Sequence, residues 1–240
     1  QSWNTGYRVI SIIQFAVVVV LLFTLPHWKK AQSLGDKSKE TYQQILSIPQ
    51  LIGLPGAKQV LLAFFSYCAI ETTVGLWGSS YLVTIRGIPT AKAASWISLY
   101  YFGITFGRLL SGFLAIRFRH KQIVQLGQFL IGAGVIVLLL PIGGNYLLAG
   151  LFLIGLGCAP IYPSLLHETP NNFGSCYSQS IMGIQMACAY VGTTFMPPLF
   201  GLLGAKMSYS LFPIFIGVLL LIMIFMVIHL YKKTGERGEQ

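Results

Sequence analysis

Long apolar stretches alternate with short polar segments along most of this chain. An α-helix needs about 20 mainly apolar residues to cross a bilayer. Stretches of about that length lie at residues 8–27, 59–85, 93–117, 122–141, 145–167, 176–204 and 209–231. Short polar connections join the last six stretches, whereas a long polar segment separates the first from the second. The pattern predicts an all-α membrane protein with seven spanning helices.

The distribution of charged residues predicts how the chain is oriented in the membrane. Only 9% of the residues are charged and 55% are hydrophobic, yet the net charge is +10. The basic residues lie between apolar runs, so we expect a lipid bilayer, and not nucleic acid, as their partner. With residue 1 outside the cell, the bases that face the cytoplasm are Lys29, Lys30, Lys37, Lys39, Lys58, Arg108, Arg117, Arg119, Lys121, Lys232, Lys233 and Arg237. Those that face outward are Arg8, Arg86, Lys92 and Lys206. Basic residues concentrate in cytoplasmic loops. We therefore expect a multi-pass protein of the plasma membrane, which in a bacterium is the inner membrane, with its C-terminus in the cytoplasm.

The long polar segment divides the chain into parts. It contains Asp36, Glu40 and several lysines, and its "YQQILSIPQLIG" portion is compatible with a short surface helix. We interpret residues 1–28 as the last helix of a preceding membrane unit and residues 29–57 as a cytoplasmic linker. Residues 58–231 then form a six-helix domain, and residues 232–240 form a cytoplasmic tail. The remainder of the preceding unit is expected to lie outside this chain.

A repeat relates two of the predicted helices. The segments "FGITFGRLLSGFLA" (102–115) and "VGTTFMPPLFGLLG" (191–204) align at an offset of 89 residues. Gly103 then matches Gly192, and Thr105 matches Thr194. The offset spans three helices, an odd number, so the two copies cross the membrane in opposite directions. Inverted repeats of three helices are typical of secondary transporters, whereas seven-helix receptors lack them.

Two sets of residues resemble a transporter family. The segment "GRLLSGFLAIRFRHKQ" (107–122) resembles the loop signature of the major facilitator superfamily, and the matching positions include Gly107, Arg108, Gly112, Arg117 and Lys121. It departs from that signature at Ile116, where an acid is usual, and at Arg119, where a second glycine is usual. "SYCAIETTVGLWGSSYL" (66–82) is similar to the seventh helix of the fucose permease group, and "GLGCAPIYPSLLHETPNNFG" (155–174) to its tenth.

The resemblance carries implications for architecture and mechanism. It implies that the first helix is helix six of a twelve-helix transporter and that the rest forms the C-terminal half, built from 3+3 inverted repeats. It also implies transport by alternating access. The acids that handle protons in the fucose symporter lie in the N-terminal half, which we expect as a partner of this chain.

Glu71 interrupts an apolar run, where a charged side chain costs about 2.5–3.5 kcal/mol on insertion scales. Three roles remain open: it binds substrate hydroxyls or an amine, it exchanges a proton, or it makes a structural hydrogen bond. We expect no salt bridge within these helices, because no basic residue lies at a comparable depth. Residues three or four apart share a helix face, so Tyr67 and Glu71 lie on one stripe with Gly75 and Gly78.

Other candidates come from side-chain chemistry and from helix breakers. Aromatic and amide side chains suit a polyhydroxylated solute, and the predicted substrate-binding residues are Glu71, Tyr67, Thr73, Trp77, Tyr101, Tyr162 and Gln185. Trp77 is equally compatible with a membrane interface, and Gln185 with holding two helices together. Glycine and proline weaken a helix, so the predicted gating or hinge residues are Gly75, Gly78, Pro160, Pro163, Pro197 and Pro198.

These observations predict a secondary transporter and not an enzyme, without a cofactor or metal. The leading hypothesis is import of a sugar or similar polar solute, coupled to protons. The alternative is a proton-driven exporter of amphipathic compounds, and a third hypothesis is a non-transporting membrane sensor.

Overall fold

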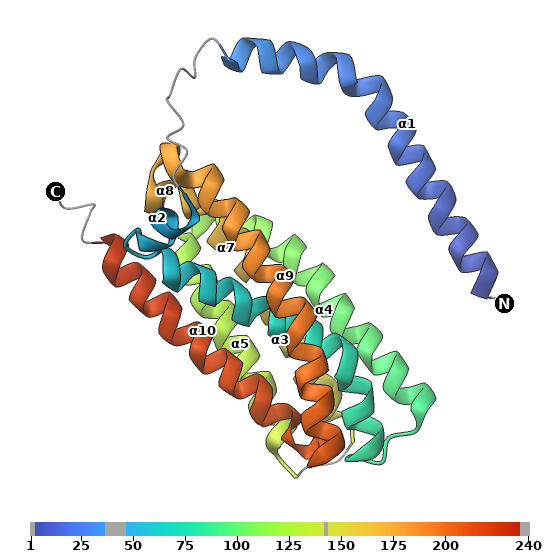
Figure 1. Cartoon of the computed structure of the whole chain (residues 1–240). Coiled ribbons are helices and arrows are strands. Elements are labelled where there is room, and N and C mark those ends of the chain that lie inside the picture. Colours follow the sequence, from blue (N-terminus) through green and yellow to red (C-terminus); the bar gives the residue numbers. More distant parts are fainter. Residues whose placement is uncertain (1–2, 37–46, 142–143, 236–240) are drawn as a thin grey trace. The chain divides into compact units, whose positions relative to one another are not determined.

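The computed structural model describes residues 3–36, 47–141 and 144–235, which fall into two units, residues 1–43 and 44–240. In the first unit, α1 (Trp3–Asp36) is a single helix that extends beyond the predicted boundary at residue 28 (Figure 1). Its Thr5–Leu25 portion has a mean hydropathy of 2.4, and none of it is buried. A helix that is apolar all round is suited to a membrane.

The second unit contains the six other predicted spans, all of them helical. Its elements are α2 (Ile48–Gly53), α3 (Ala57–Thr84), α4 (Thr90–Arg117), α5 (His120–Leu139), α6 (Tyr146–Cys158), α7 (Ile161–His167), α8 (Thr169–Phe173), α9 (Ser175–Lys206), a 3₁₀ turn (Tyr209–Leu211) and α10 (Phe212–Gly235). Across the described residues, seven helical segments are long and apolar enough to span a membrane. The predicted all-α fold is confirmed, and α2 is the short helix expected at the end of the polar segment.

Helix pairing reveals the two repeats. The first repeat comprises α3, α4 and α5, and the second comprises α6 with α7, α9 and α10. Both α4 and α5 pack against α6, whereas α9 and α10 pack against α3. Equivalent helices of the two repeats are also buried to a similar extent. In the most apolar 18-residue segment of each helix, the buried share is 61% in α3 and in α6–α7, 22% in α4 and in α9, 44% in α5 and 39% in α10. Each repeat therefore completes its core with helices of the other.

Two equivalent glycines permit close contacts between these helices. A Cβ atom on Gly103 would lie 2.8 Å from the carbonyl oxygen of Phe152 in α6. A Cβ on Gly192, the repeat equivalent, would lie 2.5 Å from the carbonyl oxygen of Phe65 in α3. Side chains at either position would push the helices apart, so the glycine match in the sequence reflects matching helix contacts.

The predicted hinges have two different outcomes. The fourth span of the six-helix unit is broken at Pro160, between α6 and α7, as expected from a residue that lacks an amide donor. By contrast, α9 continues through Pro197 and Pro198. The helix α3 is likewise continuous through Gly75 and Gly78, which lie against the side chains of Tyr101 and Ile97. The gating role of these glycines and prolines stays a prediction.

The two ends of the bundle differ in charge. Because consecutive spans run antiparallel, α3 and α5 begin at the end where α4, α7 and α10 finish, beside α2 and α8 (Figure 1). We call this the basic end. Its exposed bases include Arg117, Arg119, Lys121, Lys232 and Lys233. At the opposite end, Arg86 donates to the carbonyl oxygens of Leu138 and Leu140, which ties the end of α3 to the end of α5.

Candidate functional site

Glu71 lies in the middle of α3 with three quarters of its side chain covered. The Tyr67 hydroxyl, one turn earlier on the same helix, donates a hydrogen bond to the Glu71 carboxylate. The Tyr100 hydroxyl, from α4, donates to the backbone carbonyl of Glu71 over 2.9 Å. Tyr67 and Tyr100 are both buried, so the acid sits in a pre-formed polar environment within an apolar bundle.

Arg108 supplies the charge partner of Glu71. Its Nη2 atom lies 3.7 Å from Glu71 Oε1, and 60% of the arginine side chain remains exposed. The expectation that no base reaches Glu71 is therefore wrong. Arg108 lies nine residues before the end of α4 at Arg117, which is about 14 Å along a helix. The signature residue thus belongs to the interior of a span, and its long side chain reaches across to α3.

A cavity of about 520 Å³ extends from Arg108 to the basic end of the bundle. Its walls come from the second half of α4, the start of α5 and α7. The polar side chains that line it are Arg108, Ser111, His120, Tyr162, Ser164 and His167. None of its described lining residues is acidic, and Glu71 lies behind Arg108. The cavity therefore offers hydrogen-bond donors and one guanidinium to an occupant.

Two histidines stand at the basic end of this cavity. The rings of His120, from α5, and His167, from α7, have centroids 4.5 Å apart. The Nδ1 atom of His120 is buried and has no hydrogen-bond partner among the residues that the structure describes. The histidine pair therefore forms a polar rim at this end of the cavity.

The repeat-equivalent position at the opposite end is filled. Gly112 lines the cavity and a Cβ there would meet nothing within 4 Å. Its repeat equivalent, Gly201, lies against the indole ring of Trp77. The Trp77 Nε1 atom donates to the carbonyl oxygen of Pro197 over 2.8 Å, and its ring stacks on Tyr209 at 5.6 Å. Trp77 therefore closes the position that the first repeat leaves open.

The family model of the Major Facilitator Superfamily matches residues 2–175 and, in a second match, residues 60–240. The chain belongs to the Major Facilitator Superfamily. The family prediction made from the loop signature is thus confirmed, and this chain is a multi-pass membrane protein of a superfamily of transporters, which are not enzymes. No curated protein sequence matches it.

Solved structures of the superfamily share the fold of this member. The peptide transporter POT in complex with sulfate superposes with a TM-score of 0.65 at 22% identity, over 76% of this chain and 39% of that one. A variant of the E. coli fucose:proton symporter FucP gives 0.60 at 20%, over 75% and 44%. The POT family transporter PepTSo gives 0.63 at 18%, over 75% and 38%. The superfamily member thus spans about two fifths of the length of these transporters.

The predicted substrate-binding residues of this superfamily member fall into two groups. Glu71, Tyr67 and Tyr162 lie together: the Tyr162 ring packs 6.0 Å from the Tyr67 ring and lines the cavity. Tyr101, in the next helix, is half exposed and rests on Gly75, while its buried neighbour Tyr100 makes the contact with Glu71. Sequence reasoning selected Tyr101 and did not predict the contact of Tyr100 with Glu71.

Thr73, Trp77 and Gln185 do not line this cavity. Thr73 is fully buried, and its Oγ1 has no hydrogen-bond partner among the described residues. Gln185 is also fully buried, and its Oε1 accepts from Thr169 over 3.1 Å. This contact favours the alternative in which Gln185 holds two helices together.

The residues of the loop signature serve several purposes. Gly107 lets α4 approach Leu156 and Ala159, Arg108 pairs with Glu71, and Gly112 lines the cavity. Arg117 ends α4 at the surface, and Lys121 lies with its Nζ 5.1 Å from the Tyr231 ring.

Sequence reasoning missed several cavity residues. The residues that line the cavity but were not selected as substrate-binding residues are Ser111, His120, Ser164 and His167. Their common signal was available: small or polar residues clustered at the predicted cytoplasmic ends of neighbouring spans. Which of these ends face each other depends on helix packing, which the sequence pattern does not contain.

Proposed function

We propose that this chain forms helix six and the C-terminal half of a secondary transporter that works by alternating access. In this proposal the transporter imports a sugar or similar polar solute together with protons. Residues 1–28 are the last helix of the N-terminal half, residues 29–57 the cytoplasmic linker, residues 58–231 the C-terminal domain and residues 232–240 the cytoplasmic tail. The basic end faces the cytoplasm, in line with the positive-inside rule.

The ion pair at the inner end of the cavity carries this proposal. A carboxylate that pairs with a guanidinium loses that interaction when it takes a proton. Protonation of Glu71 would therefore release Arg108 into the cavity, where its rigid fork of donors can bind a solute oxygen. Deprotonation would restore the pair and favour release of the solute. Glu71 is thus proposed to exchange the proton, and Arg108 and Tyr162 to contact the solute.

The relatives support a polar solute. One of the similar structures is a fucose:proton symporter, and others are peptide transporters. Sugars and peptides are both rich in hydrogen-bonding groups, which matches a cavity lined by hydroxyl, imidazole and guanidinium donors.

Transport into proteoliposomes tests the proposal. The intact transporter is reconstituted, and uptake of labelled hexoses is measured with and without an inward proton gradient. We expect gradient-dependent uptake that Glu71→Gln abolishes, while exchange of internal for external solute persists because exchange needs no net proton movement. Glu168→Gln is the matched control, since this acid lies outside the cavity, and it should retain gradient-driven uptake. Gradient-driven uptake at the wild-type rate in Glu71→Gln would contradict the assigned role.

The exporter remains a second candidate because of the aromatic rings near Glu71. Tyr162 packs 5.2 Å from Phe64 and 6.0 Å from Tyr67, both ring-centroid distances. Rings beside an acid also suit an amphipathic cation. Proton-driven extrusion of such a cation by the intact protein, with no hexose uptake, would favour the exporter over the importer.

A further inference from the structure

A second hollow lies on the other side of the bundle, between α5 and α10. This α5–α10 groove has a volume of about 660 Å³. Its α5 wall runs from Gln125 through Gly132 to Ile136, and its α10 wall includes Ile224 and Ile228. Apart from two glutamines near one end, the walls are apolar. Gly132 leaves the space open, because the nearest atom to a Cβ there would be a Leu220 methyl at 3.5 Å.

The groove has the dimensions of one lipid leaflet. Residues 125 to 136 of α5 span about 16 Å at 1.5 Å per residue. The hydrocarbon core of a bilayer is about 30 Å thick, so one leaflet contributes about 15 Å. An acyl chain that enters at the glutamine end would therefore be covered along most of its length.

Gln128 gives the groove a polar anchor. The side chain lines the groove and is only 5% exposed. Its Nε2 atom has no hydrogen-bond partner within the described part of the chain. A buried donor without an acceptor is destabilising, and an ester carbonyl in the groove would supply that acceptor.

Basic residues continue both walls at the basic end. Lys121 precedes Gln125 by four residues and Lys232 follows Ile228 by four, so each lysine lies on the helix face that forms a wall. Both lysines are exposed. The acid nearby is Glu168, whose carboxylate accepts from the Tyr231 hydroxyl and from the backbone amide of Lys121. Among the residues that the structure describes, Lys121, Lys232 and Lys233 outweigh this single acid, so they make the mouth of the groove positive.

We propose that the α5–α10 groove is a binding site for an anionic phospholipid. The phosphate lies at Lys121 and Lys232, an ester carbonyl accepts from Gln128, and one acyl chain runs over Gly132. A zwitterionic lipid of the same chain length fills the groove equally well but gains less from the lysines. This site does not depend on the proposed transport function.

Native mass spectrometry of the intact protein tests the lipid class. The protein is released from micelles that contain phosphatidylglycerol or phosphatidylcholine with the same acyl chains. We expect the protein to bind phosphatidylglycerol more tightly than phosphatidylcholine. The variant Lys232→Gln should bind phosphatidylglycerol about fivefold more weakly, since a lysine near anionic lipid contributes about 1 kcal/mol. Lys206→Gln, at the opposite end, is the matched control and should leave binding unchanged. Equal binding of the two lipids, or equal effects of the two lysine variants, would overturn the proposal.

Two further variants locate the lipid within the groove. Gly132→Leu fills the groove and should abolish selective binding, whereas Gly217→Leu, on α10 outside the lining residues, should preserve it. Gln128→Leu should weaken binding of ester-linked phosphatidylglycerol but not of its ether-linked analogue, which lacks the carbonyl. If Gly132→Leu does not fold, the ester–ether comparison decides: the same response of both lipids to Gln128→Leu would exclude the assigned anchor.

Discussion

Glu71 illustrates how a charge is accommodated inside an apolar bundle. The side chain accepts from Tyr67, pairs with Arg108 and lies beside Tyr100, so partners on two helices offset the loss of solvation. The sequence indicated that Glu71 matters, because an isolated acid in a span is costly. It did not indicate Arg108 as the partner, because periodicity assigns residues to faces of one helix and says little about contacts between helices.

The ion pair should be measurable as a coupling in stability. Arg108→Gln leaves the Glu71 carboxylate without its charge partner, so we expect the folded protein to lose about 1 kcal/mol, a value typical of a half-exposed pair. In a Glu71→Gln background the same change should cost less. Thermal unfolding of the four proteins in detergent gives the coupling energy. Arg117→Gln, an exposed control on the same helix, should be neutral in both backgrounds, and strict additivity of Arg108→Gln with Glu71→Gln would contradict the pairing.

Glu168, between α7 and α8, should make stability depend on pH. Burial is the largest influence and raises the pKa of Glu168 above 4.5, although the Tyr231 hydrogen bond and Lys121 act in the opposite direction. The folded state therefore binds this proton more tightly than the unfolded state. The resulting stabilisation is complete below pH 4.5 and is lost as the pH rises through the folded-state pKa.

The measurement is the unfolding temperature as a function of pH for wild type and Glu168→Gln. We expect the wild type to lose more stability than the variant as the pH rises above 4.5. Tyr231→Phe removes a hydrogen bond to the carboxylate, so it should raise the pKa of Glu168 further and extend the loss to higher pH. Parallel curves for wild type and Glu168→Gln would show that the carboxyl does not titrate differently on unfolding.

At the scale of helices, hydrophobic length was the dependable signal. The stretch predicted at 59–85 is observed as Ala57–Thr84, and that at 93–117 as Thr90–Arg117. Proline and glycine were less informative, because their effect depends on the neighbouring helix. Pro160 breaks a span, Pro197 lies within a continuous helix, and Gly75 provides room for a tyrosine ring.

The paired glycines of the repeat should be intolerant of a methyl group. In Gly103→Ala and Gly192→Ala the new Cβ would meet a backbone carbonyl at 2.8 Å and 2.5 Å, which the helices relieve only by moving apart. We expect each to destabilise the protein by about 1–3 kcal/mol in thermal unfolding. Gly183→Ala is the control in α9, since nothing lies within 4 Å of its Cβ position. It should be neutral or stabilising by up to about 1 kcal/mol, and equal losses at all three sites would refute the close-contact explanation.

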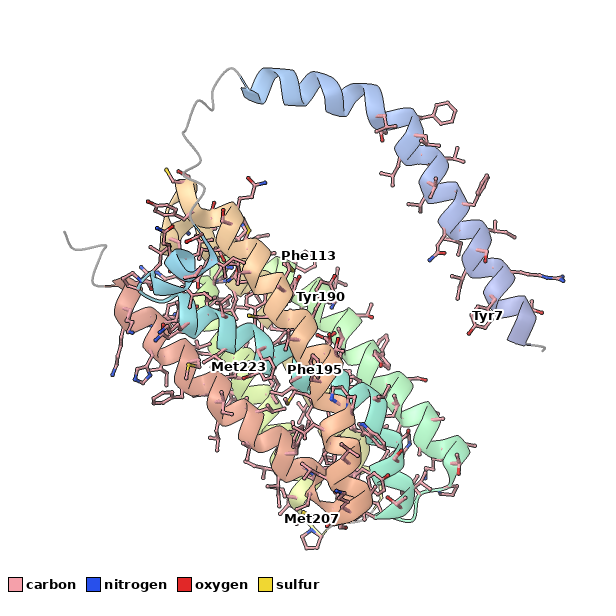
Figure 2. The ribbon with its side chains drawn as sticks, in the orientation of Figure 1. Tyr7, Phe113, Tyr190, Phe195, Met207 and Met223 are labelled. Carbon is pink, nitrogen blue, oxygen red and sulfur yellow. The ribbon has the colours of Figure 1, made fainter. Side chains whose placement is uncertain are left out.

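For the whole molecule, the sequence repeat predicted the architecture but not its asymmetry. The apolar stretches, the offset of 89 residues and the loop signature together predicted the membrane fold and the superfamily. They could not show that Gly112 borders a cavity while Gly201 is covered by Trp77. The difference arises from large side chains contributed by other helices, and an alignment of two similar segments does not include them. Figure 2 shows how densely side chains such as Phe195 and Met223 occupy the bundle and its surface.

This asymmetry predicts one-sided access to the cavity. A cysteine in place of Gly112 has free space around its Cβ and lines the cavity. In inside-out vesicles a membrane-impermeant maleimide should label Gly112→Cys more strongly than it labels the wild type, whose four native cysteines set the background. In right-side-out vesicles the labelling of Gly112→Cys should stay at this background. Lys206→Cys, at the opposite end, should be labelled in right-side-out vesicles and stay at background in inside-out vesicles. Labelling of Gly112→Cys from the outside would contradict the proposed orientation.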